Sequence, residues 1–357
     1  MPESTTFGGG ERVLLALSRY LHGQSMPHRF AWYYDNVKLA PRASWPVREN
    51  HLNPARRPLK KIQALDRFLK AAEGANSGSV LLVGIQAALH ASLCSAEGYS
   101  LMILDTPSLL SPSPERPLGS LGAALRDQCT RPLIRKAMHK ARTVIATTGY
   151  MAEEIKRLYH RTPVVIHQGA PQGRFLPRAP GPGEAVRMLS VCRLEANKRV
   201  DWILEAMAAL RTEPAPGVLV DIVGAGSEAE SLQNRCYRLG LSDCVTFHGR
   251  VDDDRLAALY RNAHLFLMPA RQGYGLPALE ALSCGMPVVL HRESGVSEIL
   301  EGTPWAELMD GNAESLVAGI RRMLPRIASG EFTRAPLPRF PSEEEWAHAV
   351  CEECGWR

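Results

Sequence analysis

The sequence predicts an α/β protein made of two Rossmann-like domains that face a cleft. Three observations carry this prediction. Short apolar runs alternate with helix-like segments along most of the chain, which is typical of parallel sheets covered by helices on both faces. Residues 171–185 are rich in Pro and Gly, as a linker between domains is. The length of 357 residues is enough for two separate cores.

Strands are expected where short apolar runs stand between turn residues. Helical patterns lie between many of these runs, for example at Val200–Leu210 and Asp253–Ala263. The expected strands, in chain order, are Val80–Val83, Leu101–Leu104, Thr143–Ala146, Val164–His167, Met188–Cys192, Val218–Val223, Val245–His248, Leu265–Met268 and Pro287–Leu290.

The linker divides the chain into an N-terminal domain, 1–178, and a C-terminal domain, 179–340. Residues 341–357 read as a C-terminal helix that packs back on the first domain. A cleft between two α/β domains is the natural place for a ligand.

Composition favours a cytoplasmic protein. The segment Met1–Gly10 lacks the basic start and apolar core of a signal peptide. The most apolar run, Val80–Cys94, is too short and too often interrupted to span a bilayer. Eight cysteines, mostly in apolar segments, are typical of reduced buried thiols. The pair Cys351 and Cys354 has no second pair, and zinc needs about four ligands. We therefore predict a buried helix face there and no metal site.

Residues 38–70 are strongly basic. Nine Lys or Arg stand against Glu49 and Asp66, a net charge of +7, with Trp45 and several leucines interspersed. A solvated surface explains such a segment, and so does a patch for anionic lipid headgroups or a phosphorylated acceptor. Nucleic acid is not expected, because the whole-chain charge of +5 is small and no nucleic-acid motif accompanies it.

Two cations follow an expected strand in SVCRLEANKRVDW. Arg193 comes directly after the strand that ends at Cys192, and Lys198 precedes the next helix. Ligands of open α/β sheets bind at the carboxyl ends of strands. An Arg fork and a Lys charge at that edge can clamp a diphosphate.

The next two strand ends carry weaker signals. Gly224 and Gly226 resemble part of a dinucleotide-binding motif, but Ala229 takes the third glycine position, so a tight turn is the better interpretation. After Gly249, the backbone of Arg250 and Val251 can meet a flat base. Asp252–Asp254 favours a helix start over a metal cluster.

The stretch RQGYGLPALEALSCGMPVV, residues 271–289, predicts a glycine turn and then a short helix. Gly273 and Gly275 permit the turn, while Pro277 and Gly285 suit the start and the end of a helix over about 277–284. The helix N-terminus presents free N–H groups to an anion. Glu280, on its first turn, can accept hydrogen bonds from vicinal hydroxyls such as those of a ribose.

Together these segments resemble the family 4 retaining glycosyltransferases of the GT-B fold, also called glycosyl transferases group 1. The resemblance is strong over residues 188–300, through RLEANKRVDWILEA, VGAGSEAESL, FHGRVDDDRLAALYRNA, GYGLPALEALSCGMPVV and SGVSEIL. It continues more weakly through FGGGERVLLALSRYL, TVIATTGYMAEEI and VIHQGAP in the first half.

The resemblance implies a nucleoside-diphosphate-sugar donor, transfer with retention, and no metal or other cofactor. Arg193 and Lys198 would hold the diphosphate and stabilise the charge on it as it departs. Glu280 would hold the ribose, and Arg250 with Val251 would meet the base.

Two backbone segments would complete the donor site that the resemblance implies. A glycine loop at residues 8–10 would close on the donor phosphates from the first domain. The turn after Gln272 would hold the sugar and the distal phosphate. The residues concerned are Gly8, Gly9, Gly10, Gly273, Tyr274, Gly275 and Leu276.

Three positions depart from the family's pattern. Gln272 replaces the usual first glutamate, eight residues before Glu280. Asp105 matches the acid of a His–Asp pair, but Leu104 occupies the His position. Residues 1–6, MPESTT, cannot form the buried strand that usually precedes the glycine loop. The N-terminal sheet is therefore expected to lack its first strand, unless the reading frame begins late.

The function predicted on this basis is a hexosyltransferase-like enzyme acting on a lipid-linked, polysaccharide or small-molecule acceptor. It would be cytoplasmic and would contact the inner face of the membrane through Lys38–Lys70. One alternative is a non-catalytic nucleotide-sugar-binding subunit that supports a partner enzyme, which Gln272 and Leu104 motivate. Another is a sugar-nucleotide epimerase, which would need a pair of cleft carboxylates that the sequence does not offer.

Overall fold

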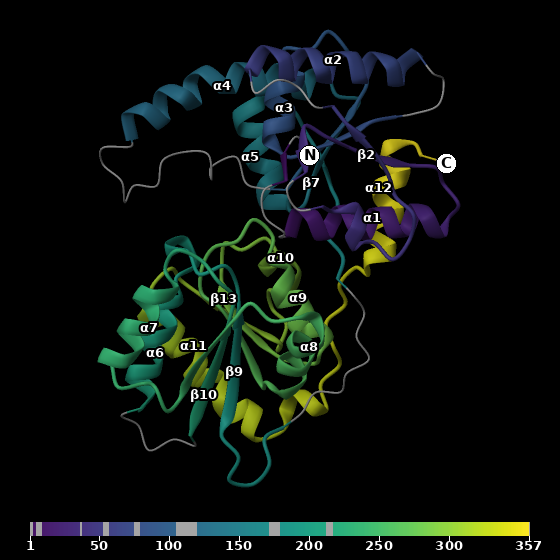
Figure 1. Cartoon of the computed structure of the whole chain (residues 1–357). Helices are drawn as coiled ribbons and strands as arrows, with labels where there is room; N and C mark the ends of the chain where they lie inside the picture. The colour runs from purple at the N-terminus through teal and green to yellow at the C-terminus, as the bar shows by residue number, and fades with distance from the viewer. Residues whose placement is uncertain are drawn as a thin grey trace. The chain divides into compact units, whose positions relative to one another are not determined.

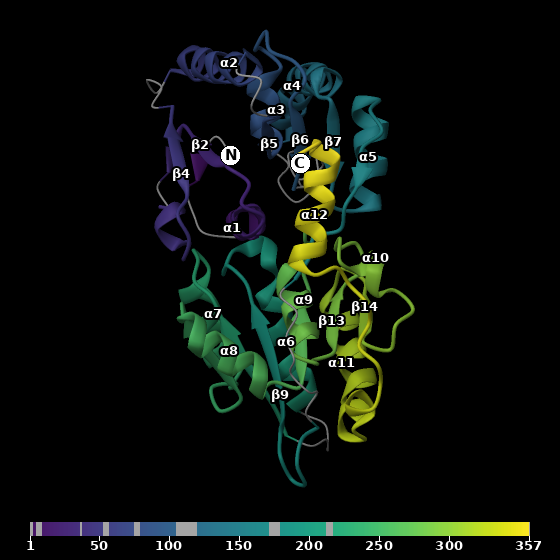
Figure 2. The same ribbon diagram turned by 90° about the vertical axis from the view of Figure 1, so that its right-hand side faces the viewer.

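The computed structural model describes residues 3–4, 9–35, 38–52, 57–74, 79–104, 120–170, 179–211 and 217–356 (Figures 1 and 2). It divides into two compact units. Unit 1 comprises Met1–Gly169 with Pro341–Arg357, and unit 2 comprises Ala170–Phe340. Most of the Pro- and Gly-rich segment predicted as the linker, residues 171–178, lies outside the described residues.

Unit 2 is a six-stranded parallel sheet with helices on both faces. The strand order is β11-β10-β9-β12-β13-β14. Helices α6, α7 and α11 cover one face, and α8 and α9 cover the other (Figure 1). The strands are β9 (Val186–Val191), β10 (Val218–Val223), β11 (Val245–Gly249), β12 (Leu265–Met268), β13 (Val288–His291) and β14 (Ala306–Met309). The helices are α6 (Val200–Arg211), α7 (Ala229–Arg238), α8 (Asp253–Asn262), α9 (Leu276–Ser283), α10 (Ser297–Leu300) and α11 (Ala313–Ala328).

The strand order reverses direction between β9 and β12. The chain winds outward from β9 to β11 and then crosses back to β12 on the other side of β9. Such a reversal opens a crevice at the carboxyl ends of the two central strands, because their following loops leave toward opposite faces. The loops after β9 and β12 are those that carry Arg193 and Gln272.

Unit 1 has a smaller parallel sheet in the order β5-β6-β7-β8 and two separate pairs, β1-β3 and β2-β4. Tyr33, Leu65 and Leu69 join the core of the four-stranded sheet. The strands are β1 (Glu3–Ser4), β2 (Arg29–Trp32), β3 (Tyr34–Asp35), β4 (Arg48–His51), β5 (Leu81–Val83), β6 (Ser100–Ile103), β7 (Thr143–Ala146) and β8 (Val164–Val165). The helices are α1 (Gly9–Gly23), α2 (Pro58–Gly74), α3 (Ile85–Ala91), α4 (Ser120–Lys140), α5 (Gly149–Tyr159) and α12 (Glu343–Cys354).

The C-terminal helix α12 belongs to unit 1, where it packs against α1. Thr143 Oγ1 hydrogen-bonds Glu353 Oε1 at 2.7 Å, and Arg142 and Ser79 both donate to the carbonyl of Cys354. Cys351 and Cys354 are buried free thiols on this helix, so the prediction of a buried helix face is confirmed. Burial raises the pKa of Cys354 to about 11 and that of Cys351 to about 12, which keeps both protonated.

The N-terminal residues meet one sequence expectation and contradict another. Glu3–Ser4 forms only a two-residue strand, β1, which pairs in parallel with β3 in a separate sheet and does not join the four-stranded sheet. Backbone hydrogen bonds hold so short a pair of strands together, so the polar sequence of β1 does not predict the strand. Gly9 and Gly10 lie in the first turn of α1 and not in a loop, while Gly8 lies outside the described residues.

The sequence also missed β2, β4 and β14. β4 (RENH) is polar, and β2 (RFAW) is a run of only four residues without apolar alternation. Their pairing is decided by their partners and not by propensity. None of the helices in the described part of the chain combines the length and apolar character needed to cross a bilayer.

Candidate donor site at the carboxyl edge of unit 2

The loop after β9 is held in place by a close approach of two backbones. Gly224 has φ +139°, and a Cβ at this position would lie 1.8 Å from the carbonyl oxygen of Cys192. Leu194 N donates to the carbonyl of Ala225 at 3.0 Å, and Glu228 N donates to the carbonyl of Leu194 at 2.9 Å. The two glycines of this turn therefore have a structural role, as the sequence indicated, and they fix the loop that begins at exposed Arg193.

Lys198 is placed by a single turn of 3-10 helix, η3 (Ala196–Lys198), directly before α6. The turn closes through the Lys198 N–H, which donates to the carbonyl of Glu195 at 2.8 Å, and it ends at Arg199 with φ 54°. The Lys198 side chain is half-buried.

The loop after β12 leads into α9. Gly275 is the N-cap, with φ +115°, and a side chain there would collide with Met268 and Val296. Pro277 stands in the first turn, where its missing N–H costs nothing. The helix runs over Leu276–Ser283, close to the predicted 277–284. Pro277 has no N–H and the N–H of Ala278 donates to the carbonyl of Gly275 at 3.0 Å, so the positive end of the helix dipole is what this turn offers an anion.

The two loops meet through Lys198 and Gln272. The ammonium of Lys198 donates to Gln272 Oε1 at 2.5 Å, and the amide nitrogen of Gln272 lies 3.4 Å from the carbonyl oxygen of Ala270. The main-chain N–H of Gln272 donates to Ser294 Oγ at 3.1 Å. Gly295 N donates back to the Gln272 carbonyl at 3.3 Å. The structure thus brings together a cation from one predicted motif and the first residue of the other.

Glu280 on α9 is held by a residue that the sequence did not single out. Tyr260, a buried residue of α8, donates its hydroxyl to Glu280 Oε2 at 2.9 Å. The ring of Tyr260 stacks on Phe266 of β12 at 6.0 Å between centroids. A buried tyrosine normally pairs its hydroxyl, and this pairing fixes one carboxylate oxygen of Glu280.

Other predicted site residues lie as follows. Arg250 is exposed and Val251 half-buried between β11 and α8. Asp252 caps α8, because its side chain accepts from Arg255 N at 2.8 Å, so the interpretation of Asp252–Asp254 as a helix start is confirmed. Gly273 and Leu276 are half-buried and Tyr274 is buried. Asp105 lies outside the described residues, and Leu104 directly follows β6.

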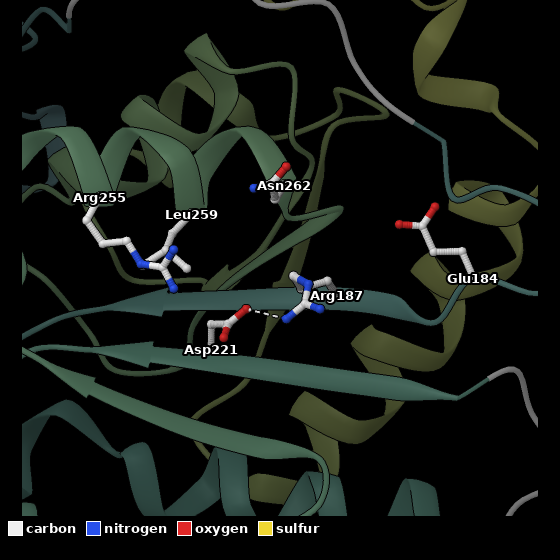
Figure 3. Close-up of a pocket in the computed structure, with 6 residues that line it drawn as sticks. All are labelled: Glu184, Arg187, Asp221, Arg255, Leu259 and Asn262. Atoms are coloured by element: carbon white, nitrogen blue, oxygen red, sulfur yellow. Dashed lines mark hydrogen bonds and ion pairs between the residues drawn. The ribbon is translucent and has the colours of Figure 1, made fainter.

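A separate cavity lies under α8, away from this edge (Figure 3). It has a volume of about 370 Å³ and is lined by Glu184, Arg187, Asp221, Arg255, Leu259 and Asn262. Buried Asp221 accepts from Arg187 Nη1 at 3.0 Å and lies 2.7 Å from His248 Nε2. Arg187 lies on β9 and is six residues before Arg193, which follows the end of that strand, so these two residues are at most about 20 Å apart. Arg187 and Asp221 pair with each other in its wall, which favours a structural role for these two residues.

No cluster of three or more His, Cys, Asp or Glu side chains suited to a metal ion occurs among the residues that the structure describes. Burial raises the pKa of Cys192, beside the crevice, to about 11, although Lys198 and Arg193 act in the opposite direction. This thiol is therefore protonated at neutral pH and a poor nucleophile.

Residues 177–326 match the family model "Glycosyl transferases group 1". D-inositol 3-phosphate glycosyltransferase 2 of Catenulispora acidiphila is 34% identical over 196 residues, which are 49% of this chain and 44% of that protein. D-inositol 3-phosphate glycosyltransferase of Streptomyces scabiei is 32% identical over 235 residues, 60% of this chain and 50% of that protein. The chain thus spans about half the length of the curated relatives it matches.

Solved structures resemble the whole chain. WaaG, a glycosyltransferase involved in lipopolysaccharide biosynthesis, has a TM-score of 0.74 at 16% identity and covers 99% of this chain and 98% of its own. HepE of Anabaena, in complex with UDP and glucose, has a TM-score of 0.73 at 19% identity, with 99% and 97% covered. At this level of identity the likeness shows the fold, and the predicted GT-B fold is confirmed.

Proposed function

Because residues 177–326 give this chain a domain of the glycosyl transferases group 1 family, we propose that it is a glycosyltransferase. It moves a sugar from a nucleoside-diphosphate-sugar donor to an acceptor, with retention and without a bound metal. The observation that carries the proposal is the 2.5 Å contact between Lys198 and Gln272. It joins the cation loop to the glycine turn at the point where the strand order reverses.

The donor's diphosphate lies between Arg193, Lys198 and the start of α9. Two cations and a helix N-terminus meet the negative charge that grows on the diphosphate as the sugar leaves, and they need not reorganise to do so. A fixed charge of this kind takes the part that a divalent metal plays in other transferases. Glu280 accepts hydrogen bonds from the ribose, and the backbone of Arg250 and Val251 meets the base.

Retention is attributed to attack on the same face of the sugar. The acceptor hydroxyl approaches beside the departing diphosphate and passes its proton to a phosphate oxygen, so no side-chain nucleophile is required. This scheme agrees with the state of Cys192, because its protonated thiol is a poor nucleophile.

The alternative of a non-catalytic subunit receives no added support. It rests on Gln272 and Leu104, and Gln272 takes part in the network that positions Lys198.

The acceptor is proposed to be lipid-linked, with polysaccharide and small molecules as the other candidates. Support comes from the basic segment Lys38–Lys70, part of which lies on α2 with Lys60, Arg67 and Lys70 exposed to solvent. Leu59 is 74% exposed there, beside exposed Lys60 and Arg67. An exposed leucine among lysines suits insertion at an anionic lipid surface. Cosedimentation with phosphatidylglycerol vesicles, but not with phosphatidylcholine vesicles, is expected, and Leu59→Ser should weaken it.

Binding of nucleoside diphosphates tests the donor site directly. Thermal shift and calorimetry with UDP, GDP, ADP and dTDP should reveal one that stabilises the protein by mass action. Arg193→Ala and Lys198→Ala should each weaken binding of that nucleoside diphosphate about tenfold, since each removes a charge-assisted contact. Arg255→Ala, the same type of change in the cavity under α8, is the matched control and should leave affinity unchanged. If both Arg193→Ala and Lys198→Ala bind the nucleoside diphosphate as tightly as the wild type, these two residues do not hold the diphosphate.

A further inference from the structure

We infer that Gln272 is a positioning residue that holds Lys198 at the diphosphate through a hydrogen bond from a neutral amide, which adds no counter-charge. The inference rests on the proposed function, since it concerns how the same site binds the diphosphate. It gives a role to the one position of the second motif where this chain carries an amide in place of a carboxylate.

The orientation of the amide follows from its two neighbours. An ammonium can only donate, so the atom that faces Lys198 at 2.5 Å is the amide oxygen. The amide nitrogen then faces the carbonyl of Ala270, which can only accept, at 3.4 Å. Each end of the side chain therefore meets a group of the opposite kind, and flipping the amide would place donor against donor and acceptor against acceptor.

The backbone of Gln272 is held as well. Its N–H donates to Ser294 Oγ, and its carbonyl accepts from Gly295 N. Ser294 is 1% exposed, so this anchor is within the core. A side chain left over from a lost catalytic role has no need of such a fixed position. Gln272 instead forms a rigid arm from the turn after β12 to the cation after β9.

The charge of the arm sets what Lys198 can do. A carboxylate at the same position would form an ion pair with the ammonium, and part of its attraction for phosphate would be offset. A neutral amide gives the ammonium a hydrogen bond, which orders it, without supplying a counter-charge. In a half-buried site this difference is larger than in water.

Gln272→Glu should therefore weaken binding of the nucleoside diphosphate that the wild type prefers by about tenfold, or about 1.4 kcal/mol. Binding of the corresponding nucleoside monophosphate should weaken much less, because it lacks the second phosphate that the Lys198 ammonium is proposed to contact. Gln272→Ala removes the side chain that holds Lys198 without adding a charge, and it should weaken binding of the nucleoside diphosphate by about threefold.

Three measurements separate this role from a general loss of structure. The Gln272→Glu penalty should begin to shrink only as the pH falls below about 4, because the ion pair with Lys198 holds the pKa of the new carboxylate below its usual value, whereas the Gln272→Ala penalty should not change there. In the Lys198→Ala background Gln272→Glu should have little further effect, since the cycle isolates coupling between the two positions. Asn262→Asp, the same charge change at the last residue of α8, is the matched control and should leave affinity for the diphosphate within about twofold.

The outcomes are distinguishable by calorimetric titration of the intact chain. Equal or tighter diphosphate binding by Gln272→Glu would overturn the inference and leave the proposed function intact. The same penalty with and without Lys198 would also overturn it, because the effect would not pass through the lysine. If the wild type binds no nucleoside diphosphate, the proposed function and the inference fall together.

Discussion

The hydroxyl of Tyr260 donates to Glu280 Oε2 at 2.9 Å, across the interface between α8 and α9. The two residues are twenty positions apart, and Tyr260 is 5% exposed. One oxygen of the carboxylate is thus fixed within the protein.

Tyr260→Phe should release Glu280 and weaken ribose recognition. We expect about fivefold weaker binding of the preferred nucleoside diphosphate, or about 1 kcal/mol, which is the typical net contribution of one hydrogen bond. The 2′-deoxy analogue should lose far less, because it offers Glu280 only one hydroxyl. Calorimetry with the two nucleotides checks this, with Tyr237→Phe, 78% exposed on α7, as control. An equal loss for both nucleotides would contradict the role given to Tyr260.

Gly224→Ala should displace the loop that carries Arg193. The φ of +139° disfavours any side chain, and the Cβ would lie 1.8 Å from the carbonyl oxygen of Cys192. A loss of at least about 2 kcal/mol in the stability of unit 2 is expected, together with loss of diphosphate binding. Gly240→Ala has a φ of +67° but nothing within 4 Å, so it should cost about 1 kcal/mol and spare binding. Comparable effects of the two changes on binding would argue against the packing role of Gly224.

Asp221→Asn should destabilise unit 2 without touching the donor edge. Asp221 is 3% exposed and is shared by Arg187 and His248. Removing its charge leaves buried polar groups poorly paired, at a cost of about 2 kcal/mol. Hydrogen exchange of the β10 and β11 amides measures this. Asp243→Asn, in an exposed pair with Arg211, should leave the exchange of these amides nearly unchanged.

Unit 1 should lose stability in acid through Asp66. Burial acts to raise the pKa of this carboxyl, but hydrogen bonds from Lys70 and from Ser95 and Ala96 outweigh it and lower the pKa to about 2. Because the folded pKa lies below the unfolded value near 3.9, the stabilisation is complete above about pH 4. It is lost as the pH falls through about 2.

Asp66→Asn should therefore lower the stability of the α2–α3 region by about 1 kcal/mol at pH 7 and flatten its decline between pH 4 and 2. Acid denaturation followed by hydrogen exchange at the Ser95 amide tests this. Glu73→Gln, which also removes a carboxylate that accepts from a loop N–H, is the control. An unchanged acid profile would show that Asp66 does not set it.

Several parts of the site could be predicted because they depend on local chemistry. The strands β10 and β12 and the helix after Gly275 agree with the sequence patterns to within about a residue, since apolar runs, Pro and Gly act through nearby backbone. Arg193 and Lys198 were identifiable because cations directly after a buried strand must lie at the sheet's carboxyl edge.

The partners of these residues could not be predicted. Nothing in the local sequence links Tyr260 to Glu280, because tyrosine in an amphipathic helix normally reads as core. The same holds for Asp221, whose position in the apolar run VLVDIV gave no sign of Arg187 or His248. Each pairing joins segments that only the strand order brings together.

By itself, the sequence determined the α/β class, the parallel strands of unit 2 and the residues that follow them, because these depend on spacing and propensity along the chain. Only the tertiary structure decided that Gln272 is the arm that holds Lys198 and that Tyr260 fixes Glu280. Those contacts exist because the chain crosses back from β11 to β12, so that loops far apart in sequence meet beside β9.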